Sequence, residues 1–169
     1  MPTDNTAIQQ DLAILAQQEA LLRFTTLDPG TAWQLGSLLR ANLLTLNTGC
    51  TVEIERDHQL LFACTTSGAK PDQADWIRRK RNTVHRFHRS SYATGRELAL
   101  NNATLESAHD LSETDFAAHG GGFPLWLTGD ATATFAGTII LSGLPQRDDH
   151  NLVVTAIAQH LNLTIPHLP

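Results

Sequence analysis

Lys80 occupies a position where a helical pattern places apolar side chains. The segment 75–87 has the periodicity of a helix whose apolar residues fall within one arc of roughly 100°, and Lys80 lies in the middle of that arc. The apolar residues of the arc are Trp76, Ile77, Val84 and Phe87. An ammonium group turned toward a core loses hydration unless an anion meets it, so Lys80 is a candidate for binding an anionic ligand or a buried carboxylate. The alternative is that its four-carbon stem covers the core while the ammonium group reaches water.

A run of three glycines after His119 is the second candidate. Gly120, Gly121 and Gly122 allow the backbone to approach a ligand closely, and their N–H groups can meet an anion or a carbonyl group. An apolar strand follows directly after Phe123. The alternative is a connector that only permits a sharp turn. His119 could be the single axial ligand that haem iron needs, or it could cap its own loop.

The segment 142–150 joins a strand to a helix and is the third candidate. Ser142 and Gly143 end the strand, and Asp148 and Asp149 lie at the N-terminal end of the helix, where the helix dipole favours negative charge. Two carboxylates there weaken the case for a phosphate site. They could pair with the lysine of the first candidate or bind a cation or a ligand amine, whereas helix capping is favoured for Asp148.

Other kinds of chemistry have less support. His85 and His88 are three residues apart and can share a helix face, but Arg86 and Arg89 place positive charge beside them and no carboxylate or cysteine is near in sequence. We therefore assign no metal site. A Gly-x-Ser-x-Gly motif, a phosphate-binding loop and a dinucleotide fingerprint are all missing from the sequence, so the catalytic residues stay unknown.

The composition is that of one globular domain over residues 1–169, with 41% hydrophobic and 17% charged residues and a net charge of −5. Half of the lysines and arginines lie between Arg78 and Arg89, and such local charge suits a pocket for a small anion better than a nucleic-acid surface. Cys50 and Cys64 predict two reduced thiols. We find neither a signal peptide nor a membrane-spanning segment, so we expect a cytoplasmic protein without nucleic-acid or membrane partners.

The elements that must hold the candidates follow from periodicity and turn residues. We expect helices over 1–20, from Asp28 to about 46, over 75–87 and 92–100, a short turn of helix at 112–118 and a final helix after Gln146. We expect strands over 21–26, 51–55, 59–65, 125–128 and 133–142, the last two joined by a turn at Gly129 and Asp130. The strands form antiparallel hairpins separated by helices. This order predicts an α+β fold with one antiparallel sheet and helices packed on it.

Three further expectations concern side-chain direction. In the second helix, the predicted buried residues are Trp33, Leu35, Leu39, Leu43 and Leu46. Alternation in the strand 51–55 turns Glu53 and Glu55 outward. The first helix, 1–20, has apolar residues that could form a subunit interface, namely Ile8, Leu12 and Leu15.

Three segments in their order and spacing resemble an uncharacterised family of haem-degrading-domain proteins: 75–84, 119–124 and 142–150. The match runs from about residue 27 to residue 161. The chain is also distantly similar to the GlcG and HbpS proteins, which share a Lys-x-x-Thr helix, here Lys80 and Thr83, and a Gly-Gly-x-Pro strand entry. The resemblance implies a profilin-like fold, which is a five-stranded antiparallel sheet flanked by helices. It also implies homo-oligomers and a haem or related tetrapyrrole ligand.

These observations lead to two hypotheses. In the first, the chain binds a small anionic ligand, with haem as the candidate cofactor and haem degradation as a candidate activity. The predicted ligand-binding residues are Trp76, Arg78, Lys80, Thr83, His119, Gly120, Gly121, Gly122, Phe123, Ser142, Gly143 and Asp149. In the second, the chain is a non-enzymatic oligomeric scaffold or protein-interaction module, in which Lys80 and an aspartate form a structural ion pair. The sequence does not decide between an enzyme and a binding protein.

Overall fold

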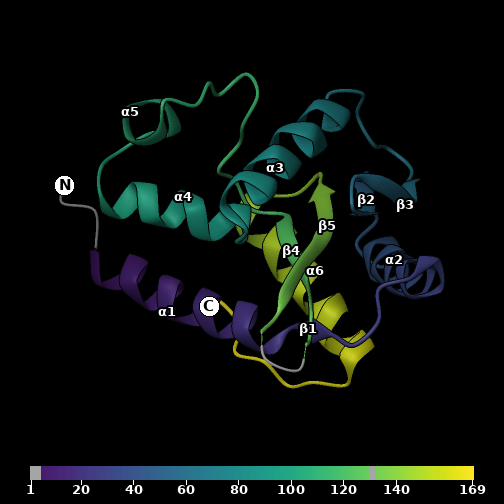
Figure 1. Cartoon of the computed structure of the whole chain (residues 1–169). Helices are drawn as coiled ribbons and strands as arrows, with labels where there is room; N and C mark the ends of the chain where they lie inside the picture. Colours follow the sequence, from purple (N-terminus) through teal and green to yellow (C-terminus); the bar gives the residue numbers. More distant parts are fainter. Residues whose placement is uncertain (1–4, 130–131) are drawn as a thin grey trace.

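A computed structural model describes residues 5–129 and 132–169 (Figure 1). In chain order the elements are α1 (Asn5–Leu21), β1 (Arg23–Phe24), α2 (Pro29–Leu44), β2 (Thr51–Arg56), β3 (Gln59–Thr65), α3 (Gln73–Phe87), α4 (Ser91–Leu100), α5 (Leu105–His109), β4 (Gly122–Leu127), β5 (Thr134–Ser142) and α6 (Gln146–Leu161). In the described part of the chain, no helix combines the length and the apolar character needed to cross a bilayer.

The strands form one five-stranded sheet in the order β1-β4-β5-β2-β3. The β2–β3, β2–β5 and β4–β5 pairs are antiparallel, which confirms the predicted α+β class. The pairing of β1 with β4 is parallel. Most of the chain separates these two strands, so no tight hairpin forces them to run in opposite directions.

Helices cover both faces of the sheet. On one face α2 and α6 enclose the larger core, in which Leu39, Leu141 and Val153 are fully buried. On the other face α3 packs Ile77 and Val84 against Ile140 of β5. The consecutive residues Leu141 and Ile140 therefore serve opposite faces, as the twofold alternation of a strand requires. The next layer is formed by α1 and α4, which lie side by side (Figure 1).

The predictions of side-chain direction are wrong for one residue of β2 and for two residues at and after α2. Glu55 is buried at 6% exposure, since the face that alternation marks as outward lies under α3. Trp33 is 67% exposed because it faces away from the stripe of Leu35, Leu39 and Leu43 on α2. Leu46 is 46% exposed because α2 ends before it, at Leu44.

The first helix begins at Asn5 in the described residues, and one face of it is covered by the rest of the chain. Leu15 packs with Tyr92 of α4 and with Leu168, and Ile8 is also buried. Of the three apolar residues assigned to a subunit interface, only Leu12 keeps partial exposure.

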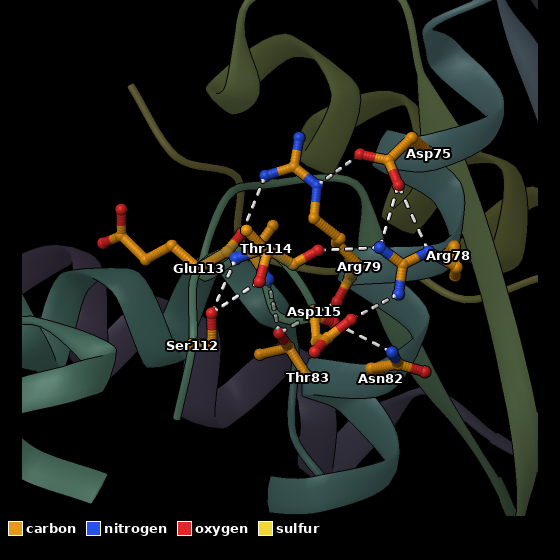
Figure 2. Close-up of polar contacts among 10 residues, drawn as sticks. Asp75, Arg78, Arg79, Asn82, Thr83, Ser112, Glu113, Thr114 and Asp115 are labelled. Atoms are coloured by element: carbon orange, nitrogen blue, oxygen red, sulfur yellow. Dashed lines mark hydrogen bonds and ion pairs between the residues drawn. The ribbon is translucent and has the colours of Figure 1, made fainter. Parts of the chain in front are cut away.

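The connection between α4 and β4 departs most from the predicted elements. The short helix lies at 105–109, where Thr104 caps it, and residues 112–115 form a turn instead. Figure 2 shows why the turn is held: α3 side chains of Arg78 and Asn82 donate to the carbonyl groups of Thr114 and Asp115. In β4 the strand starts at Gly122, before the predicted residue 125. The predicted turn at Gly129 and Asp130 lies partly outside the described residues.

Candidate functional site

Lys80 is buried at 3% exposure in the middle of α3, as its position between Ile77 and Val84 predicts. Its Nζ donates to Oδ2 of Asp149 at 3.0 Å and to the carbonyl oxygen of Leu141 at 2.9 Å. The ammonium group therefore does not reach water along the surface. The prediction that an anion meets this buried lysine is confirmed, and the anion in the folded chain is a carboxylate of α6.

Asp149 links the lysine to the turn between β5 and α6. Its Oδ1 accepts the backbone N–H of Leu144 at 3.0 Å, and its side chain is 2% exposed. Asp148 beside it is exposed, so only one of the two predicted aspartates belongs to the site. Burial raises the pKa of Asp149 to about 6, although Lys80 and the N–H donors of the turn act in the opposite direction. Burial likewise lowers the pKa of Lys80, and Asp149 opposes that change.

The backbone of the glycine run packs directly against this ion pair at Gly121. Gly121 has φ of 118°, and a Cβ there would lie 2.2 Å from the oxygen of Leu141 and 2.9 Å from Nζ of Lys80. Only glycine fits such a position. The N–H groups of Gly120 and Gly122 donate to Gln146 Oε1 at 3.3 Å and Ser91 Oγ at 2.9 Å, so these two donors meet acceptors of the chain itself rather than a ligand anion.

A cavity of about 530 Å³ opens beside the ion pair. It is bounded by α3, the His119 loop, the turn between β5 and α6, and the loops that precede β2 and α3. Its lining residues are Thr48, Gly49, Gly68, Lys70, Asp72, Gln73, Trp76, Lys80, His119, Ser142, Gly143, Leu144, Gln146 and Asp149. The volume lies within the range of about 300 to 1,000 Å³ that small-ligand sites occupy.

Aromatic side chains form one wall of the cavity. The rings of Trp76 and His119 meet edge to face with centroids 5.3 Å apart, and the guanidinium group of Arg79 lies 4.0 Å from the Trp76 ring centroid. Desolvation lowers the pKa of His119, and the positive charges of Lys80 and Arg79 lower it further. His119 is therefore a neutral imidazole at neutral pH, which is the form that can ligate a metal.

A second hollow of about 440 Å³ adjoins the first, since Thr48 and Leu144 line both. It is more apolar, with Leu46 and Leu152 among its lining residues. The two hollows together offer a charged inner end at Lys80 and an apolar outer surface.

Six of the predicted site residues line the cavity, Gly121 packs against Lys80 beside it, and Arg78, Thr83 and Phe123 have structural positions elsewhere. The six that line the cavity are Trp76, Lys80, His119, Ser142, Gly143 and Asp149. Arg78 instead pairs with Asp75 at 2.9 Å and Asp115 at 3.0 Å, as Figure 2 shows. Phe123 is 1% exposed in the core under α2 and α6, so it forms no cavity wall.

Thr83 also has a structural position. Its Oγ1 accepts the N–H of Ala117 at 3.0 Å and donates to the carbonyl oxygen of Arg79 at 3.1 Å, which ties the connection before β4 to α3. The sequence reasoning missed Gln73, which is buried and donates to the carbonyl oxygen of Gly49 at 2.9 Å. It also missed Lys70 and Asp72 at the cavity rim. Their place just before the Lys80 helix is the signal that could have identified them.

A family model described as "Haem degrading protein HbpS-like" matches residues 27–158. The chain belongs to this HbpS-like family. The curated relative from Serratia proteamaculans, a "UPF0303 protein", is 46% identical over 94% of this chain and 97% of its own length. The HbpS-like fold is also seen in solved structures. The structure of Ybr137w has a TM-score of 0.83 at 23% identity over 94% of both chains. A structure described as "PduOC:Heme Complex" has a TM-score of 0.66 at 20% identity, covering 84% of this chain and 99% of the other.

Proposed function

We propose that this HbpS-like chain binds a small ligand that carries a carboxylate and an apolar body, and that haem or a related tetrapyrrole is that ligand. The observation that carries the proposal is the buried ammonium group of Lys80 at the wall of a cavity of about 530 Å³. An ammonium group has three N–H donors. Within residues 5–129 and 132–169, two acceptors lie within hydrogen-bond distance of Nζ, so one donor remains for a ligand.

The charges around the cavity favour a ligand that has an apolar part as well as a carboxylate. Lys70 and Lys80 line it together with Asp72 and Asp149, so the lysine charges are balanced by carboxylates. A ligand carboxylate would have to gain a directed hydrogen bond from Lys80 rather than rely on a general positive field. The apolar part of the ligand would lie on Trp76 and Leu144 and continue toward Leu46.

Haem has this combination of features. His119 is a neutral imidazole at the rim and would ligate the iron, while Lys70 and Lys80 line the cavity and would meet the propionate groups. The description of the family and the haem complex of the PduOC neighbour support this ligand class. Bound haem would supply the iron centre for oxygen chemistry, while the chain would bind and orient the porphyrin.

A haem titration of the untagged chain tests this proposal. We expect a saturable shift of the Soret band at about one haem per chain, and we expect His119→Ala to change or abolish it. The matched control is His109→Ala, because His109 is also exposed but lies outside the cavity. Unsaturable binding, or the same spectrum in both variants, would contradict the haem proposal. A loss of affinity in Lys70→Gln with an unchanged spectrum would support the propionate contact.

A second function, that of an oligomeric scaffold, is favoured by exposed apolar residues. Trp33 is 67% exposed on α2, and Leu60 is 55% exposed on β3, which is an edge strand of the sheet. Edge strands and exposed aromatic residues are typical of subunit contacts. Light scattering is expected to show a homo-oligomer that Trp33→Gln weakens, and a monomer at all concentrations would exclude this function. We also propose a cytoplasmic location, which the free thiols of Cys50 and Cys64 support.

A further inference from the structure

A second group of ligating side chains lies at the other end of α3, away from the Lys80 cavity. Glu55 of β2, His58 of the following turn and His85 of α3 each offer one atom, and these atoms lie within 4.8 Å of one another. We propose that these three residues bind a divalent transition-metal ion such as Zn²⁺. Two imidazoles and a carboxylate form a known zinc ligand set that leaves a further coordination position open.

The hairpin β2–β3 is built so that it presents two of the ligands. Asp57 and His58 both have positive φ, at 50° and 64°, which is the backbone of a tight two-residue turn. The pairing register of β2 and β3 shifts between Ile54 and Glu55 because Leu61 of β3 is left unpaired, whereas β2 stays in register with β5. Regular alternation along β2 therefore turns Glu55 toward α3, where it contacts Nε2 of His85.

In the sequence, the positive charges of Arg86 and Arg89 argue against a metal site near His85. In the structure, both side chains interact with other groups. Arg89 pairs with Glu97, and the guanidinium group of Arg86 lies 5.6 Å from the ring centroid of Phe87. Arg81 does contact the group, with Nε 3.9 Å from Oε2 of Glu55. Its Nη1 donates to Oε2 of Glu53 at 2.6 Å, which compensates much of its charge.

Glu55 is held in place by its surroundings. Its side chain is 8% exposed, and Thr138 Oγ1 donates to its Oε1 at 3.4 Å. A carboxylate that is oriented by a neighbouring hydroxyl group is a common feature of metal sites, because the second partner fixes the ligand geometry.

There is room for an ion and for a further ligand. A hollow of about 430 Å³ is lined by His58 and His85 and reaches His88, whose ring stacks on Phe135 with centroids 4.2 Å apart. The rings of His58 and His85 are stacked at 4.5 Å and 15°. An ion must lie in the plane of each imidazole it binds, so His58 has to turn its exposed ring when the ion enters. Zn–N distances of about 2.0 Å require ligand atoms roughly 3.3 Å apart. Ligand atoms of the group lie up to 4.8 Å apart and must approach one another, whereas Glu55 and Nε2 of His85, which contact each other directly, must separate to admit the ion.

Zn²⁺ titration of the metal-stripped, untagged chain against a chromophoric chelator tests the proposal. We expect about one equivalent of Zn²⁺ per chain. His58→Asn, which retains a residue type that tolerates positive φ, and His85→Gln are each expected to weaken binding about tenfold or more. The control is His167→Asn, an exposed histidine outside the group. Imidazole proton resonances of His58 and His85 are expected to shift together on saturation, as their stack opens.

Three results would overturn the proposal: no saturable zinc binding by the wild-type chain, equal affinity in all variants, or an equal loss in His167→Asn. Circular dichroism of each variant verifies that the fold is retained, and His58 is suited to this test because it is exposed on a turn. The proposal is independent of haem binding, since the haem titration of His58→Asn is expected to match that of the wild-type chain.

Discussion

Nζ of Lys80 lies 3.0 Å from Oδ2 of Asp149, although 69 positions separate the two residues in the chain. The lysine comes from the middle of α3 and the aspartate from the first turn of α6, so the pair joins helices that cover opposite faces of the sheet. It crosses the sheet at the end of β5, where the carbonyl oxygen of Leu141 accepts a second hydrogen bond from the same ammonium group. The cavity proposed as the ligand site opens at this junction.

Removing one member of the ion pair is expected to lower the free energy of unfolding more than removing both members. Asp149→Asn leaves a buried ammonium group without its counter-ion, and we predict a loss of about 3–5 kcal/mol in the free energy of unfolding. Lys80→Met added to Asp149→Asn is expected to recover at least about 1 kcal/mol, because the unpaired charge is gone. Urea unfolding of both variants gives these values. The exposed neighbour provides the control, since Asp148→Asn is expected to change stability by less than about 0.5 kcal/mol.

The protonation of Asp149 can be followed directly by its side-chain carboxyl ¹³C shift. We expect a titration midpoint near 6, well above the ordinary pKa of 3.8, because the carboxyl group is buried. Lys80→Met is expected to move the pKa still higher, since the ammonium group lowers it. The folded chain thus binds this proton more tightly than the unfolded chain, so Asp149 makes the free energy of unfolding rise as the pH falls from about 6 toward about 4. A midpoint at or below 3.8 would contradict this, because it would show that Lys80 and the N–H donors outweigh the effect of burial.

His150 is expected to have the opposite effect on the pH dependence of the free energy of unfolding. It is fully buried, its Nε2 is 2.8 Å from Oε1 of Gln18, and burial lowers its pKa to about 3. Below its ordinary pKa of 6.5 the unfolded chain takes up a proton that the folded chain refuses, so His150 lowers the free energy of unfolding as the pH falls from about 6.5 toward 3. We predict that His150→Gln makes stability less sensitive to pH over this interval. Parallel pH profiles of the variant and the wild-type chain would refute this assignment.

The sequence pattern of one helix was enough to predict that Lys80 is buried, but not which aspartate it binds. The burial of Lys80 follows from helical periodicity, which depends only on residues within the same helix. The choice of Asp149 over Asp148 depends on how the turn between β5 and α6 approaches α3, and Asp149 alone of the two reaches both Lys80 and the N–H of Leu144. Spacing along the chain could not separate these neighbours.

The wrong predictions have two physical causes. Either a second layer of the fold covers the residue, or the side chain binds a residue that the pattern of its own element does not reveal. Glu55 alternates outward correctly, yet the outer face lies beneath α3, so a solvated glutamate becomes a buried metal-ligand candidate beside His85. Arg78 has the charge suited to a ligand carboxylate, but Asp75 and Asp115 occupy it. Neither outcome is encoded in the periodicity of a single helix or strand.

If the ammonium group of Lys80 meets the ligand, its removal must weaken haem binding, and a haem titration of the Lys80→Met/Asp149→Asn double variant measures that loss. This variant removes the donor without leaving an unpaired buried charge. We predict a roughly ten- to hundredfold weaker affinity, which corresponds to the loss of one hydrogen bond to a charged group, while the spectral signature of His119 ligation is retained. Haem affinity equal to that of the wild-type chain would show that the ligand does not touch Lys80 and would contradict the proposed site.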